Sequence, residues 1–248
     1  MATRVYYLLA NFVVESPQHK TLGMNILIAT VLVILTVGYD IQIISETSPS
    51  AKTDTPAIEK TVNLDVPFMP QAPHGNWNLP YQEACEETSI IMVEHYLSGE
   101  KLTPARADTD ITEMVDWETE NGLDISIGAV ETLKVASVFY DLKGDILYNK
   151  EVTLSKIKQL LSEGHPIIIP VAGQVLANPN YGGEGPPYHM IVLKGYDETH
   201  FITHDPGTQL GANHRYTYET IYNAIHDWTG SNSTIDTGRK AMLVLYSS

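Results

Sequence analysis

The chain has 248 residues, which is enough for one domain with a sizeable core and an appended segment. Asp and Glu number 30 against 15 Lys and Arg, so the formal net charge of −15 argues against binding to nucleic acid and favours basic or neutral partners. The single cysteine, Cys85, excludes an internal disulfide framework and a thiolate-rich zinc or iron–sulfur site.

Residues 22–39 form an uncharged, mostly apolar run of 18 residues, about long enough to span a bilayer. Arg4 and Lys20 precede this run and Asp40 follows it, which favours an N-terminus inside the cell and the remainder outside. We therefore expect residues 1–44 to hold a single-pass membrane anchor and the rest to be extracytoplasmic. The alternatives are a cleaved signal peptide, which would make the protein secreted, and a buried helix.

Residues 45–61 are rich in Ser, Thr, Pro and charge, and they predict a linker. The globular domain then covers residues 62–248, a common size for one domain. It should begin with a short strand at 63–70. The next elements are predicted to be helices, at residues 84–97, 102–121 (one or two), 126–140 and 154–163.

Beyond residue 165 short β-branched runs alternate with turn residues, which predicts strands. The predicted strands cover residues 166–172, 189–197, 201–207 and 240–247, and one more helix is expected at 216–228. Helices that precede most of the strands indicate an α+β fold. We expect a mostly antiparallel sheet packed against the earlier helices.

Cys85 stands at the predicted start of the first helix, where unpaired backbone amides favour a thiolate. Glu83, Glu86 and Glu87 oppose this effect through like charge, although acidic residues also suit a helix N-terminus for structural reasons. A lone cysteine is more often a small buried hydrophobe. A nucleophilic role therefore requires a nearby base and a group that orients the base.

His189 is the best placed of nine histidines for the base, because it opens a predicted strand. Asp205 closes the next predicted strand, and a hairpin turn at 197–200 would bring the two to the same end of adjacent strands. Asp205 also precedes Pro and Gly, which is typical of a simple turn. His200 and His204 offer a weaker zinc alternative, and we assign no metal site.

Three motifs in this order resemble the bacteriocin-processing peptidase-like domains, a papain-like group of cysteine peptidases. The motifs are VPFMPQ with EACEETS, then PPYHMIVLKGYD, then THDPGT, within about residues 64–245. The resemblance implies that Cys85 is the nucleophile, that His189 is general base and then acid, and that Asp205 orients His189. It further implies a papain-like fold and a peptide or protein substrate, and we expect no cofactor.

The resemblance also implies a glutamine in the oxyanion hole, with the backbone amide of Cys85 as the second donor. Gln71 matches the strand-then-Gln pattern and is preferred, although it lies 14 positions before the cysteine; Gln82 is held in reserve. Such domains often have Gly-Pro after the cysteine, where this chain has Glu86 and Glu87. This departure keeps open a binding module without catalysis, and the same triad would also serve acyl transfer.

Three further features surround the predicted site. The loop 176–187, rich in Gly and Pro, directly precedes His189 and indicates either a gate of the site or an ordinary exposed connection. Trp77 is expected to anchor the core or its loop rather than to line a cleft. Residues 107–133 contain eight acidic residues and no Lys or Arg, which a solvated helix face explains.

Overall fold

The computed structural model describes residues 59–248 of the chain. The predicted membrane segment and most of the predicted linker lie outside these residues. Within the described part, no helix is both long enough and apolar enough to cross a bilayer.

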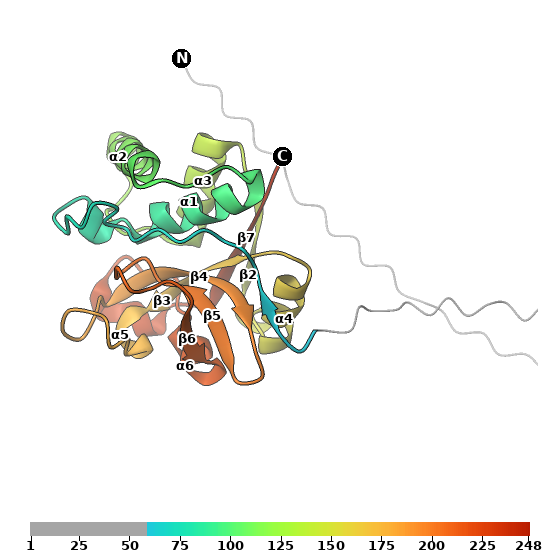
Figure 1. Ribbon diagram of the computed structural model, residues 1–248. Helices are drawn as coiled ribbons and strands as arrows, with labels where there is room; N and C mark the ends of the chain where they lie inside the picture. Colours follow the sequence, from blue (N-terminus) through green and yellow to red (C-terminus); the bar gives the residue numbers. More distant parts are fainter. Residues whose placement is uncertain (1–58) are drawn as a thin grey trace, which may run out of the picture. The chain divides into compact units, whose positions relative to one another are not determined.

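Seven strands form one sheet in the order β2-β7-β3-β4-β5-β6, and the short β1 pairs with the end of β4 (Figure 1). Every pairing is antiparallel, so the predicted type of sheet is confirmed. The strands are β1 (Val62–Asn63), β2 (Lys143–Tyr148), β3 (Ile167–Ala172), β4 (Tyr188–Tyr196), β5 (His200–His204), β6 (His214–Thr217) and β7 (Ala241–Tyr246).

The observed strands differ from the predicted ones in two ways. β2 and β6 were not predicted, because they are edge strands without a continuous apolar run, and all their residues except Tyr216 are exposed or half-buried. The strand predicted at 63–70 is wrong beyond its first residue: β1 ends at Asn63, and the following residues are extended chain that carries Gln71 toward the site.

The described residues form six α-helices (Figure 1). They are α1 (Cys85–Ser98), α2 (Pro104–Glu120), α3 (Ala129–Tyr140), α4 (Leu154–Ser162), α5 (Gly173–Leu176) and α6 (Tyr218–Ala224). Five of them match predicted helices to within a few residues. The four-residue α5 was not predicted, because one turn is too short to show a helical period.

Both faces of the central strands are buried, which explains their continuous apolar sequence. Alternate residues of β3, β4 and β7 pack in one cluster against α1, α2 and α3, which Figure 1 shows grouped on one side; these are Ile168, Met190, Val192, Leu243 and Leu245. The residues between them pack in a second cluster with α4 and α6; these include Ile167, Ile169, Ile191, Leu193 and Val244. The sheet therefore separates two apolar cores.

Helix α1 is fixed against β4 at the position that matters for the site. Its C-terminus is set by Gly99 in the left-handed conformation, φ 71°. Near its N-terminus, the hydroxyl of Ser89 donates a hydrogen bond to the carbonyl of Met190 at 3.5 Å. This contact brings the first turns of α1, which begin with Cys85, to the start of β4, which holds His189.

Candidate active site

His189 and Asp205 form a buried hydrogen-bonded pair. The β4–β5 hairpin turns at residues 197–200 as predicted, and Val192 pairs with His204, so the chain leaves β5 near the start of β4. Nε2 of His189 lies 2.9 Å from Oδ1 of Asp205, and the two residues are 1% and 0% exposed. The two residues that the hairpin spacing predicted to lie near each other are therefore in contact in the structure.

Five donors surround the Asp205 carboxylate, of which Nε2 of His189 is one. The others, at 2.6–3.0 Å, are the backbone N–H of Gly207 and the side chains of Asn178, Tyr181 and Tyr216. Burial acts to raise the pKa of the Asp205 carboxyl, but the His189 ring and the hydrogen bonds from His189 and the two tyrosines outweigh burial and hold this pKa well below its usual range. Asp205 is therefore an ionised acceptor.

The charge of Asp205 decides which nitrogen of His189 carries hydrogen. Because the carboxylate only accepts, Nε2 of His189 is the donor, and Nδ1 keeps the lone pair that a general base needs. A Cβ on Gly207 would lie 2.9 Å from His189 Nε2 and 3.2 Å from Asp205 Oδ1. The glycine of the Asp-Pro-Gly sequence is thus required by the close approach of the ring.

Cys85 and His189 line the same cavity, which has a volume of about 380 Å³. The thiol is hydrogen-bonded to a carboxyl group: Sγ of Cys85 donates to Oε2 of Glu86 at 2.8 Å. Burial raises the pKa of Cys85, and the charge and hydrogen bond of Glu86 and the charge of Glu87 raise it further. The helix N-terminus therefore does not produce a thiolate in this conformation, because burial and like charge outweigh it.

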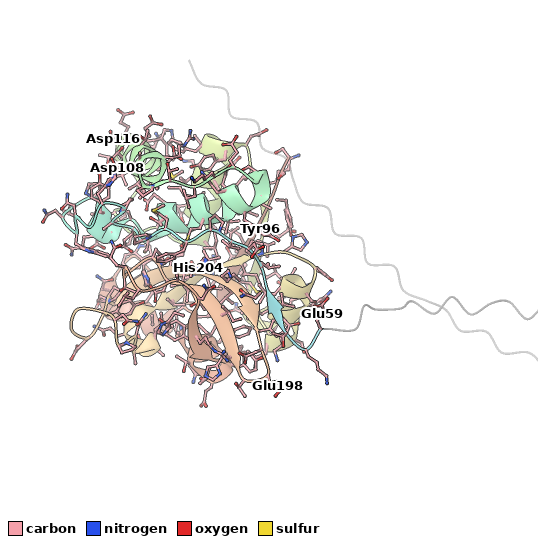
Figure 2. The ribbon with its side chains drawn as sticks, viewed as in Figure 1. Glu59, Tyr96, Asp108, Asp116, Glu198 and His204 are labelled. Atoms are coloured by element: carbon pink, nitrogen blue, oxygen red, sulfur yellow. The ribbon has the colours of Figure 1, made fainter. Side chains whose placement is uncertain are left out.

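Glu86 and Glu87 are each only 1% exposed. Burial raises the pKa of Glu86 to about 7, although Oε1 accepts a hydrogen bond from the backbone of Ile127 at 3.0 Å. Burial and the charge of Glu118 on α2 raise the pKa of Glu87 well above its usual range. Glu118 is itself buried, so the solvated-face interpretation is wrong for this residue; it holds for the exposed Asp116, labelled on α2 in Figure 2.

Gln71 and Gln82 both line the cavity, but only Gln71 is held in place. Gln71 is 4% exposed; its Nε2 donates to the backbone carbonyl of Gln82 at 2.7 Å, and its backbone N–H donates to the carbonyl of Pro206 at 2.9 Å. The side chain of Gln82 is exposed and reaches Glu83 at 3.4 Å. An oxyanion donor acts best when its N–H is already held in place, so the hydrogen bonds of Gln71 favour it over Gln82.

Trp77 was expected to anchor the core or its loop rather than to line a cleft; it lines the cavity with 37% of its surface exposed, so that expectation is wrong. The zinc alternative also finds no support. Both ring nitrogens of His204, in the centre of Figure 2, bond backbone groups, whereas His200 lies at the other end of β5 beside Thr199. In the described residues there is no group of three side chains that would hold a metal ion.

The structure adds site residues that sequence reasoning missed. The loop before His189 contributes Asn178 and Tyr181 to Asp205, and the Tyr181 ring lies edge-on to the His189 ring at a centroid distance of 5.9 Å. The position of this loop directly before His189 was the available signal. The loop lines the cavity, so it is more than an ordinary exposed connection, and the gate stays a prediction. Tyr216 was predicted to start the helix 216–228, but it lies on the edge strand β6, and α6 begins at Tyr218.

The comparisons with known proteins agree with this fold. The model of the Peptidase_C39 like family matches residues 63–234. The chain belongs to this family. A crystal structure described as a "putative C39-like peptidase" from Bacillus anthracis has the same fold, with a TM-score of 0.50, 17% sequence identity, and coverage of 77% of this chain and 100% of that chain. A search of curated proteins found no match. The predicted membership of the C39-like peptidases is confirmed.

Replacing Glu86 by glutamine isolates its effect on the thiol. Glu86→Gln keeps an acceptor for Ile127 but removes the negative charge and offers sulfur an N–H, so we expect the pKa of Cys85 to fall. Alkylation by iodoacetamide should become several-fold faster above about pH 7, where Glu86 is ionised, and differ less below it. Cys85 is the chain's only cysteine, so alkylation reports on it alone. Equal rates at every pH would contradict control of the thiol by Glu86.

Proposed function

We propose that this chain is a cysteine peptidase that hydrolyses peptide or amide bonds through Cys85, His189 and Asp205. The supporting observation is the buried His189–Asp205 pair at the cavity that also contains Cys85, in a chain of the C39-like peptidase family. Nδ1 of His189 is the free base of the pair, and Cys85 is the nucleophile available in the same cavity.

The resting thiol is protonated and bonded to Glu86, so His189 accepts its proton when substrate binds and the sulfur turns toward the carbonyl. Sγ then forms a bond to the carbonyl carbon, and the oxygen takes up the negative charge. We assign the Nε2 group of Gln71 and the backbone N–H of Cys85 as the donors to this oxygen. Asp205 holds the His189 ring in orientation and stabilises its cation.

Collapse of the tetrahedral intermediate breaks the C–N bond, and Nδ1–H of His189 protonates the leaving amine. The acyl group remains on Cys85 as a thioester. Water then gives a proton to His189, attacks the thioester and releases the acid, while the proton returns to sulfur. Atoms and charge balance with water as the co-reactant, and no cofactor is needed.

Profiling with a mixed peptide library tests this function. The wild-type protein is expected to produce new peptide termini that mass spectrometry detects, and Cys85→Ala, compared at equal folded concentration, is expected to produce none. The same fragments from Cys85→Ala, or no fragments from the wild-type protein, would contradict the proposal. The cleaved sequences would also reveal the side-chain preference.

A binding module without catalysis is the second candidate. The hydrogen bond from Cys85 to Glu86 and the raised pKa of the thiol favour it, because a buried neutral thiol is a weak nucleophile. For such a module, library peptides would bind the wild-type protein and Cys85→Ala equally and remain uncleaved. Acyl transfer would instead appear as ligated products when an amine is added.

From the sequence alone, we also propose that residues 22–39 anchor the domain in a membrane with the domain outside the cytoplasm. Membrane fractionation is expected to recover the full-length chain with the membranes. Full-length chain found wholly in the cytosolic fraction would contradict this placement.

A further inference from the structure

The cavity at Cys85 is lined by one acidic residue, Glu83, and by no lysine or arginine. Glu83 is half-buried in the 3-10 turn Tyr81–Glu83 that leads into α1. Its side chain accepts one hydrogen bond, from Gln82 at 3.4 Å, and no Lys or Arg among residues 59–248 forms a salt bridge with it. The wall beside the nucleophile thus contains an acidic residue that has no Lys or Arg partner among the described residues.

The surroundings of Glu83 make a positive charge in this cavity favourable. Burial raises the pKa of Glu83, whereas the hydrogen bond from Gln82 and, more weakly, the charge of His189, which lines the same cavity, lower it. Glu83 also lines a neighbouring cavity together with Asp124 and Glu118. A partly desolvated carboxylate gains more from a cation than an exposed one does.

An aromatic wall adds a second feature that suits a cation. Trp77 lines the same cavity as Glu83 and is 37% exposed. An indole face attracts ammonium and guanidinium groups and also packs against the methylene chain of a lysine or arginine. The net charge of −15 would draw such peptides toward the protein.

We propose that this cleft selects peptides that carry a lysine or arginine side chain next to the scissile bond, with the cationic group paired to Glu83. The catalytic form of this inference rests on the proposed peptidase function. The charge preference itself is a binding property of the cleft, and it is measurable without turnover.

Matched peptides test the preference. Each pair differs only by lysine or Nε-acetyl-lysine at one position within about two residues of the cleaved bond. For one such position we expect kcat/KM of the wild-type protein to be about five- to tenfold higher for lysine. Glu83→Gln should reduce the ratio to about twofold or less, because the lysine peptide alone loses a charged partner. Higher salt should weaken the wild-type preference.

Glu198→Gln is the charge-matched control, because Glu198 is an exposed residue of the β4–β5 turn, at the lower edge of Figure 2. It should retain the preference for lysine. If Glu83→Gln slows both peptides of a pair equally, Glu83 acts on His189 rather than on the substrate, and the inference is overturned. A wild-type ratio near one at every position would also overturn it.

A binding measurement separates this inference from the peptidase proposal. Fluorescence anisotropy with Cys85→Ala should give a lower Kd for the lysine peptide than for the acetyl-lysine peptide. With Cys85→Ala combined with Glu83→Gln, the two peptides should have equal Kd values. If the wild-type protein cleaves no peptide, the peptidase proposal fails while the two Kd values still decide the charge preference. Equal Kd values for both peptides with Cys85→Ala would overturn the inference.

Discussion

Replacing His189 is expected to lower kcat/KM for peptide hydrolysis by roughly a thousandfold or more. The thiol of Cys85 is neutral and buried in the resting protein, so little attack occurs without a base to remove its proton. Nδ1 of His189 is that base in our mechanism, since Nε2 is committed to Asp205. The measurement is steady-state hydrolysis of a peptide identified from the library.

Two variants are needed, because His189→Ala removes one of the five donors to the buried Asp205 carboxylate, its only ion-pair partner in the described residues, and costs stability. His189→Gln retains an N–H for Asp205 but has no group that titrates, so it should keep the fold and lose the activity. His200→Ala, at the turn end of β5, is the matched control and should remain active. Activity of folded His189→Gln within about tenfold of the wild-type value would contradict the assigned role.

Replacing Asp205 is expected to damage both activity and stability. In Asp205→Asn an amide N–H₂ replaces one carboxylate oxygen and faces groups that are themselves donors. The substitution also removes the charge that orients the His189 ring. We expect kcat/KM to fall by roughly a hundred- to ten-thousandfold. Asp205→Ala also strands its five donors, and it should lower the free energy of unfolding by about 3 to 5 kcal/mol, measured by urea denaturation.

The pH dependence gives the sign of the Asp205 effect. The pKa of Asp205 is lower in the folded protein than in the unfolded chain, so its stabilisation is present above about pH 4 and is lost as the pH falls through the folded-state value. The difference in stability between the wild-type protein and Asp205→Asn should therefore shrink in acid. Asp116→Asn, on the exposed face of α2 in Figure 2, is the control and should change little.

Removing single hydroxyl donors tests whether the residues around Asp205 only hold its carboxylate in place or take a larger part in catalysis. Tyr181→Phe and Tyr216→Phe each keep the aromatic ring and remove one hydroxyl donor to Oδ2. The remaining donors still hold the carboxylate, so each effect should be smaller than that of Asp205→Asn. An effect of Tyr181→Phe as large as that of Asp205→Asn would contradict a purely supporting role for its hydroxyl.

The pairing of His189 with Asp205 was predictable because strand spacing fixes it. A turn at 197–200 between two apolar runs sets which residues meet, and the hairpin register follows from that turn. Helix α1, which begins at Cys85, was equally predictable, since a helical pattern of apolar residues marks its body and Gly99 marks its end. Local periodicity and turn chemistry therefore placed the three main residues in order, with a family resemblance to interpret them.

The burial of the acidic residues beside Cys85 was not predictable from local sequence. Glu86 and Glu87 fit the first turn of any exposed helix, and only the packing of α2 and of the chain at Ile127 shows that they are buried. The same holds for Asn178 and Tyr181, whose loop has no periodicity. Contacts between segments that are distant in sequence depend on the tertiary fold, which a local pattern does not encode.

Detection of an acyl group on Cys85 tests the central claim most directly. A peptide substrate is mixed with the wild-type protein, the reaction is quenched in acid within one turnover, and the mass of the digest peptide that contains Cys85 is measured. We predict an increase equal to the acyl part of the substrate, sensitive to hydroxylamine as a thioester is, and its absence from Cys85→Ala. Hydrolysis by Cys85→Ala at the wild-type rate, or an acyl group found on another residue, would contradict catalysis by Cys85.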